Sequence, residues 1–132
     1  MAQEFARIFA QTNTIAVVGI SEKPGRAGHY VPEYLAGQGY EILGVTPSGH
    51  NSLASQSART LDELGRQVDL VLMFRRSDQV GEHLADILKL DPLPRVVWMQ
   101  TGIRNDVFAR ALEARGIEVV SDRCAMVEHR LL

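Results

Sequence analysis

Apolar residues occur along this chain in short, unbroken runs that are rich in β-branched side chains, a pattern typical of strands buried on both faces. Five such runs predict five strands, at Ile15–Gly19, Glu41–Val45, Val68–Phe74, Val96–Met99 and Ile117–Val120. Apolar residues return at helical spacing after the first, third and fourth runs, and also before the first, at Phe5, Ile8 and Phe9. The alternation predicts an α/β fold: a three-layer, Rossmann-like domain in which helices cover both faces of a five-stranded parallel sheet.

The stretch between the second and third predicted strands is less regular. Residues 46–52 are polar and predict a loop. Residues 60–64 predict one short helix, in which Thr60 caps the amino end and Glu63 completes a capping box. We expect no strand in this stretch.

Length, charge and cysteine content narrow the class of protein. The chain has 132 residues, which predicts a single domain over residues 1–132. Its net charge of −2 argues against nucleic-acid binding, and no apolar run approaches the roughly 20 residues that span a bilayer. The amino-terminal residues lack the pattern of a signal peptide, and one cysteine, Cys124, excludes an internal disulfide. We therefore expect a cytoplasmic protein that acts neither on nucleic acid nor at a membrane.

The first candidate site follows the first strand, since parallel strands bring their carboxyl ends to one edge of a sheet, where such folds bind ligands. Gly19 lets the backbone approach a ligand, and the next helix offers free N–H groups. Ser21, Lys23 and Arg26 suit a phosphate or pyrophosphate, although a solvated basic loop is the alternative. Ser21 stands where the dinucleotide fingerprint G-x-G-x-x-G has its second glycine, so the loop is not that fingerprint.

The second candidate loop follows the second strand. An NAD-binding domain usually carries Asp or Glu there to hold the ribose hydroxyls, whereas this strand ends in Val45, Thr46 and Pro47. The rigid, flat ring of Pro47 could support an adenine ring, or it could simply end the strand.

The third candidate loop holds two adjacent arginines, Arg75 and Arg76, directly after Phe74 at the end of a buried strand. The two cations repel each other unless an anion or a carboxylate lies nearby. A ligand with several phosphates would relieve that repulsion, because Arg suits bidentate phosphate contacts. Salt bridges to Asp78, Glu82 or a partner subunit are the alternative.

The last two loops contribute apolar and small groups. Gly102 permits close backbone approach, and Ile103 could pack on a pantetheine-like chain or a ring. Cys124 and His129 stand five positions apart, which does not align them on a helix, and we expect Cys124 to be a small buried hydrophobe. His29 could lie near the first loop and contact a phosphate. The histidines share no metal-ligand spacing and no carboxylates pair at this edge, so we expect neither a metal nor catalysis.

Five segments match the motifs of a known protein family and follow one another in the family's order. They lie at residues 16–24, 44–47, 74–77, 97–103 and 122–129. The chain resembles the small stand-alone CoA-binding proteins, whose fold is similar to the CoA-binding domain of the succinyl-CoA synthetase α subunit. The resemblance implies a Rossmann-type domain that binds CoA through its ADP and phosphate groups, without the catalytic residues of the synthetase. The residues expected to contact CoA are Gly19, Ser21, Lys23, Arg26, Pro47, Phe74, Arg75, Arg76, Gly102 and Ile103.

Two segments depart from the family pattern, and two other functions stay open. Residues 48–54 are more polar than the corresponding family stretch, and Gly25 and Gly28 replace bulkier residues, which predicts a more mobile first loop. The alternatives are an NAD- or other nucleotide-dependent enzyme and a regulatory nucleotide-sensing domain. The expected partner is therefore one small molecule, CoA or an acyl-CoA, bound to a monomer or a homodimer.

Overall fold

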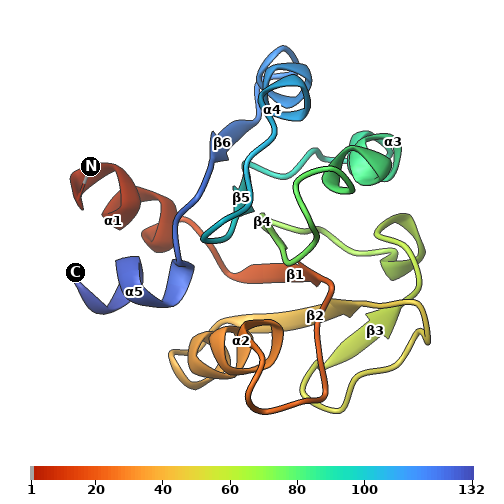
Figure 1. The fold of residues 1–132 in the computed structure, drawn as a ribbon, viewed down its shortest axis with the longest axis vertical. Helices are drawn as coiled ribbons and strands as arrows, with labels where there is room; N and C mark the ends of the chain where they lie inside the picture. The colour runs from red at the N-terminus through yellow and green to blue at the C-terminus, as the bar shows by residue number, and fades with distance from the viewer. Residues whose placement is uncertain (1) are drawn as a thin grey trace.

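Six parallel strands form the sheet at the centre of the computed structural model, which describes residues 2–132 (Figure 1). The strands are β1 (Thr14–Val18), β2 (Glu41–Val45), β3 (Gln56–Ala58), β4 (Leu70–Met73), β5 (Val96–Met99) and β6 (Glu118–Val120). Their order across the sheet is β3-β2-β1-β4-β5-β6, and every neighbouring pair is parallel. This is the order of a doubly wound Rossmann fold, so the predicted fold class is confirmed.

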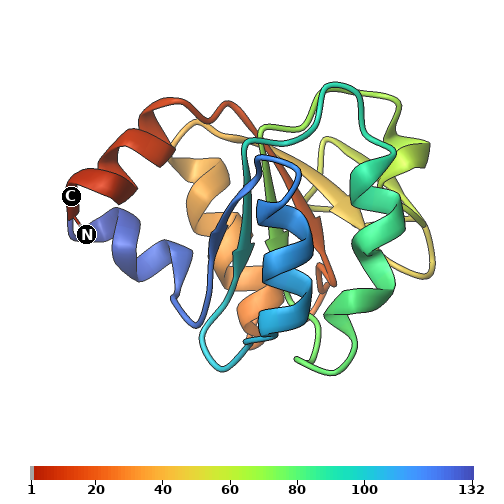
Figure 2. The ribbon, with the colours of Figure 1, turned by 90° about the horizontal axis from the view of Figure 1, so that it is seen from above.

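Helices cover both faces of the sheet. They are α1 (Ala2–Ala10), α2 (Ala27–Gly37), α3 (Leu84–Leu88), α4 (Asp106–Glu113) and α5 (Ala125–Arg130), with 3₁₀ turns η1 (Asp62–Leu64) and η2 (Val80–His83). Figure 2 shows α1, α2 and α5 on one side of the strands and α3 and α4 on the other. Along β1, Ile15 and Val17 enter the core on the first side, and Ala16 and Val18 enter the core on the second. Burial on both faces explains why the strands read as continuous apolar runs.

The sheet has one strand more than the sequence predicts. The additional strand is β3, the outermost strand of the sheet beside β2. The two strands pair from Gln56 opposite Leu43 to Ala58 opposite Val45. Only Ala58 of its three residues is buried, so the strand has no apolar pattern to reveal it. The helix predicted at residues 60–64 is the shorter η1; the Glu63 carboxylate still accepts a hydrogen bond from the Thr60 N–H at 3.3 Å.

His129 lies where α5 meets the helices on its side of the sheet. Its Nδ1 is 2.8 Å from the hydroxyl of Tyr34 on α2, and its ring makes edge contacts with Phe9, Tyr34 and Tyr40. These contacts join α1, α2 and α5 into one layer. His129 therefore has a packing role among the aromatic rings of this layer.

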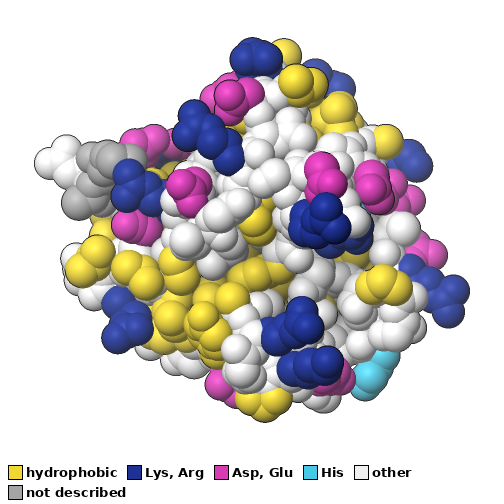
Figure 3. All heavy atoms as spheres, in the orientation of Figure 1, with side chains coloured by type: hydrophobic (Ala, Val, Ile, Leu, Met, Phe, Trp, Pro, Cys, Tyr) yellow, Lys and Arg dark blue, Asp and Glu magenta, His cyan; other side chains and the backbone are white. Residues whose placement is uncertain are grey.

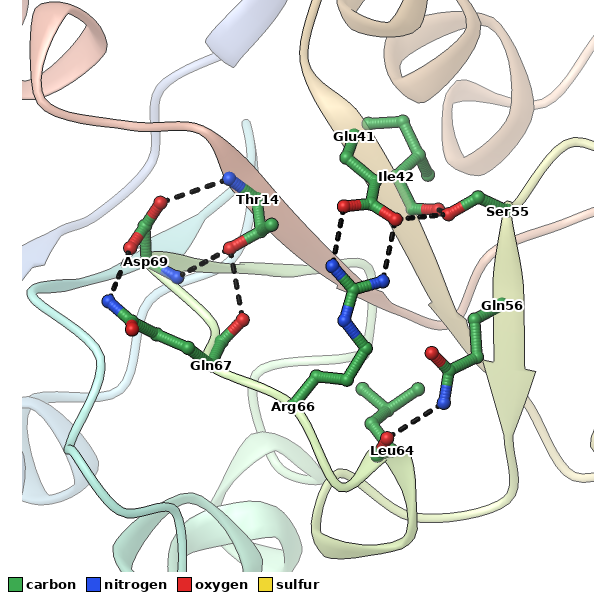
Figure 4. Close-up of polar contacts among 9 residues, drawn as sticks. All are labelled: Thr14, Glu41, Ile42, Ser55, Gln56, Leu64, Arg66, Gln67 and Asp69. Atoms are coloured by element: carbon green, nitrogen blue, oxygen red, sulfur yellow. Dashed lines mark hydrogen bonds and ion pairs between the residues drawn. The ribbon is translucent and has the colours of Figure 1, made fainter.

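The amino ends of the strands are held by hydrogen bonds between side chains and backbone (Figure 4). The Asp69 carboxylate, just before β4, accepts from the backbone N–H groups of Asn13 at 2.8 Å and Thr14 at 3.0 Å, where β1 begins. At the start of β2, Glu41 binds the Arg66 guanidinium through two contacts of 2.6 Å. The polar groups at these ends thus bind partners within the protein, although a cavity of about 330 Å³ also lies there, beside Asn13, Thr14, Arg66 and Asp69.

Candidate functional site

Two cavities lie at the carboxyl ends of the strands. The larger, of about 630 Å³, is bounded by the loops after β4, β5 and β6 and by the start of α2. The smaller, of about 290 Å³, lies beyond the ends of β1 and β2. Arg75 lines both, so its side chain stands where the two cavities meet. On the face that Figure 3 shows, Lys and Arg side chains surround an apolar hollow near the centre.

The structure brings together seven of the ten residues predicted to contact the ligand. Phe74, Arg75, Arg76, Gly102 and Ile103 line the larger cavity. Gly19 and Pro47 line the smaller one with Arg75.

Ser21, Lys23 and Arg26 line neither of these two cavities. They lie in the loop between β1 and α2, where the Ser21 hydroxyl accepts a hydrogen bond from the Lys23 N–H at 3.0 Å. His29 lies close to this loop, as predicted: its Nδ1 is 2.7 Å from the Ser21 carbonyl oxygen. The loop thus binds its own backbone, and its two basic side chains stand outside the cavity walls.

Two glycines let the first loop pass close to its neighbours. Gly19 has a φ of +86°, and a Cβ atom there would lie 2.5 Å from the carbonyl oxygen of Phe74. Gly28, in the first turn of α2, is also tightly packed, since a Cβ atom would lie 2.8 Å from the Gly19 carbonyl oxygen. The close approach at Gly19 is to Phe74 within the protein, so its expected approach to a ligand stays a prediction, and the packing role of Gly28 was not predicted.

The two arginines after β4 both have carboxylate neighbours, the alternative that the sequence left open. Arg75 lies 3.6 Å from Glu82, and Arg76 lies 3.0 Å from Asp78. The Arg75 side chain is 28% exposed and stands between the cavities, whereas that of Arg76 is 74% exposed. A contact of 3.6 Å to an exposed carboxylate is weak. Arg75 therefore remains able to bind an anion in either cavity.

Two basic residues of the smaller cavity, Arg59 and His83, were not among the predicted residues. Burial lowers the pKa of His83, and the Arg75 cation lowers it further. The Nε2 atom of His83 is buried without a hydrogen-bond partner among the described residues. Arg59 follows β3, so predicting that strand would have placed its carboxyl end among the candidate loops. No carboxylate lines this cavity in the part of the chain that the structure describes.

One wall of the larger cavity is a set of loops that bind one another. The Gly102 N–H donates to the Asp122 carboxylate at 2.7 Å, and the Asp122 N–H donates to the Ile103 carbonyl at 3.1 Å. The Ser77 hydroxyl accepts from the Arg104 N–H at 2.9 Å. These bonds join the loops after β4, β5 and β6, so this wall is formed by the protein itself.

Residues 13–130 match the family model of the CoA binding domain, which spans most of the chain. The chain belongs to the CoA-binding domain family. The predicted family resemblance is thereby confirmed.

Similar proteins share this domain over nearly their whole length. YneT, an uncharacterized protein of Bacillus subtilis, is 33% identical over 126 residues, which cover 96% of this chain and 92% of YneT. The solved structure of a Thermus thermophilus protein is 41% identical, with a TM-score of 0.92 and coverage of 99% and 98% of the two chains. A hypothetical protein from Pyrococcus horikoshii is 26% identical, with a TM-score of 0.92 and coverage of 100% and 92%.

Cys124 lies at the boundary between the core of this CoA-binding domain and its larger cavity. It is only partly buried, packs against the core beside α5, and also lines the larger cavity. The prediction of a small buried hydrophobe is therefore incomplete. In residues 2–132, no group of three His, Cys, Asp or Glu side chains could hold a metal ion, and no helix is long and apolar enough to cross a membrane.

Proposed function

We propose that this protein binds coenzyme A, or an acyl-CoA, along the carboxyl edge of its sheet. The adenosine would occupy the smaller cavity, the pantetheine chain the larger one, and the pyrophosphate the region between them. The observation that carries this proposal is the position of Arg75, which lines both cavities. CoA has the same order of parts: a nucleoside, then charged phosphates, then a long and largely uncharged chain.

The smaller cavity suits an adenosine. Pro47 offers a flat apolar surface at the end of β2, and Gly19 brings backbone close to the ligand without a side chain. NAD-binding domains usually hold the unsubstituted ribose with a carboxylate, and none lines this cavity in the described residues. This difference favours CoA over NAD.

The larger cavity suits a pantetheine chain. Phe74, Ile103, Tyr30 and Cys124 give it apolar walls, and Gly102 adds no side chain beside them. Binding sites for small molecules combine such walls with a few fixed polar groups. The pantetheine thiol, or an acyl group on it, would then lie on the side of this cavity away from Arg75.

We propose binding without a reaction catalysed by this chain. Asp78 is the carboxylate that lines the larger cavity among the described residues, and it pairs with Arg76. Asp122, outside that lining, accepts a hydrogen bond from the Gly102 N–H. In the described part of the chain, neither has a second carboxylate or a histidine as the partner that proton transfer requires.

Calorimetric titration with CoA, acetyl-CoA, NAD and ATP tests the proposal. We expect CoA to bind most tightly, together with its acetyl thioester. CoA at 100 times its dissociation constant should stabilise the fold by about 2.7 kcal/mol in thermal unfolding. A melting shift with NAD and none with CoA would contradict the proposal.

Alkylation of Cys124 tests where the pantetheine lies. Since the chain has one cysteine, and acetyl-CoA has no free thiol of its own, the loss of free thiol reports this site alone. Saturating acetyl-CoA should slow the reaction with a small alkylating reagent, because the pantetheine chain covers the sulfur. Alkylation at the same rate with acetyl-CoA bound would place the pantetheine outside the larger cavity.

A further inference from the structure

Arg59 is a basic side chain of the smaller cavity whose guanidinium has no ion-pair or hydrogen-bond partner among residues 2–132 that the structure describes. The other arginine of this cavity, Arg75, faces Glu82. The wall also includes the buried, unpaired Nε2 atom of His83. The cavity thus combines two guanidinium groups and an unsatisfied ring nitrogen, and no carboxylate among the described residues lines it.

Local contacts fix where Arg59 stands. Its backbone N–H donates to the Glu63 carboxylate at 3.1 Å, directly after β3. Its side chain passes the turn at Gly49, where a Cβ atom would lie 3.2 Å from the Arg59 Cγ. A larger residue at position 49 would therefore push this side chain away. The stem of Arg59 is held at the cavity, and its charged end is left free.

The place of Arg59 in the fold indicates which part of a ligand it meets. The Thr46 N–H donates to the Ala58 carbonyl at 3.1 Å, so Arg59 stands next to the end of β2. In Rossmann domains this is the position of the adenosine ribose: an acid here binds free hydroxyls, and an arginine nearby accommodates a phosphate on the ribose. This chain has the arginine without the acid.

We infer that Arg59 recognises the phosphate on the adenosine ribose of the bound ligand, and so makes the site selective for CoA over dephospho-CoA, which lacks that phosphate. The inference rests on the proposed function. The two arginines of the smaller cavity then bind different parts of the ligand. Arg75 meets the pyrophosphate between the cavities, and Arg59 meets the ribose phosphate at the far end. A guanidinium binds a phosphate through two parallel hydrogen bonds.

Calorimetric titration of CoA and dephospho-CoA into the wild type and three variants tests this inference. The wild type should prefer CoA by at least about tenfold, as expected for one charge-assisted contact. Arg59→Gln should weaken CoA by a similar factor and change dephospho-CoA less than about twofold, and Arg59→Lys should keep part of the preference. Arg110→Gln removes the same charge from the exposed surface of α4 and should change neither affinity.

Each other outcome counts against one proposal or both. Equal affinity of the wild type for CoA and dephospho-CoA would overturn the role of Arg59 while leaving CoA binding intact. An equal loss of both ligands in Arg59→Gln would also overturn it, since the residue would then act on a group that the two ligands share. A wild type that binds neither ligand would overturn the proposed function and this inference with it. Arg59 is exposed, so the unfolding curve of Arg59→Gln should match the wild type.

Discussion

The two edges of this sheet are built from the same strands and differ in where their polar groups are directed. At the amino edge, the Asp69 carboxylate binds the backbone of Asn13 and Thr14, and Glu41 binds Arg66. These groups meet partners within the protein at 2.6–3.0 Å. They hold β1, β2 and β4 together, and the polar groups beside the cavity at this edge are bound to one another.

At the carboxyl edge the backbone is satisfied, but basic side chains remain available. The Gly19 N–H donates to the Val45 carbonyl at 2.9 Å, and the Phe74 N–H donates to the Val18 carbonyl at 2.8 Å. Arg59 and Arg75, by contrast, border a cavity with no carboxylate partner or only a distant one. The comparison indicates that the amino edge contributes stability and the carboxyl edge contributes binding, and substitutions can test this division.

The largest effect on stability should come from Gly19→Ala. Gly19 is an exception to the division between a stabilising edge and a binding edge, because it lines the smaller cavity and is also tightly packed. The substitution places a methyl group 2.5 Å from the Phe74 carbonyl oxygen at a positive φ. We expect a loss of about 3 kcal/mol in the free energy of unfolding, measured by denaturant titration, together with weaker CoA binding.

Gly116→Ala is the matched control for this substitution. Gly116 has a φ of +81°, but nothing lies within 4 Å of its Cβ position, so this variant shows the cost of the backbone conformation alone. We expect about 1 kcal/mol. Equal losses in the two variants would show that the contact between Gly19 and Phe74 contributes nothing.

The next effect should come from removing both arginines after β4. Arg75→Ala combined with Arg76→Ala should weaken CoA by about 100-fold, because the lost partners are on the ligand. Unfolding should change by less than about 1 kcal/mol, since the ion pairs that these arginines make are exposed. In the single variants, Arg75→Ala should account for most of the loss, as Arg75 lines both cavities. Unchanged CoA affinity in the double variant would place the phosphates elsewhere.

At the opposite edge, Asp69→Ala should show the reverse pattern. It leaves the N–H groups of Asn13 and Thr14 without their acceptor and should reduce the free energy of unfolding by about 2 kcal/mol. CoA affinity, measured well below the melting temperature, should stay within about twofold of the wild type. Asp69→Asn retains one acceptor oxygen and should lose less. A large drop in affinity in a folded Asp69→Ala protein would show that the two edges are coupled.

The sequence predicts the central strands because each is buried on both faces. Residues Ile15 to Val18 are apolar without interruption, and alternate side chains enter opposite cores. The same apolar pattern is missing from β3, the outermost strand, where Gln56 and Ser57 are only partly buried. An edge strand of three residues is set by its pairing with β2, and local sequence carries little sign of that pairing.

The sequence locates a residue at the cavities where it also predicts the strand before that residue. Pro47, Arg75 and Ile103 were located because each follows a recognised strand, and such loops meet at one edge. Arg59 was missed with β3, and His83 reaches the smaller cavity from η2, through tertiary contact alone. Lys23 was predicted to contact the ligand because it is a basic residue after the first strand, but its side chain lines neither cavity. The sequence shows the charge of a side chain and not its direction.

The smallest effect should come from the Glu41–Arg66 ion pair at the amino edge. We expect this pair to affect the stability of the fold without affecting CoA binding. Hydrogen bonds from Arg66 and Ser55 lower the pKa of Glu41 to about 2 from 4.5. Because the folded-state pKa lies below the unfolded value, the pair stabilises the fold above about pH 4.5, and this contribution is lost as the pH falls towards 2. Both side chains are substantially exposed, so the contribution is small and screened by salt.

The comparison of wild type with Glu41→Gln in denaturant titrations at several pH values measures this contribution. The wild type should be slightly more stable near neutral pH, and its advantage should shrink as the pH is lowered through the window below about 4.5. Arg66→Gln should remove most of this pH-dependent difference, because it removes the partner that lowers the pKa of Glu41 most and leaves the hydrogen bond from Ser55. An advantage that persists unchanged to pH 2 would mean that Glu41 acts through packing. CoA affinity should be the same in all three proteins, since the pair lies at the edge opposite the cavities.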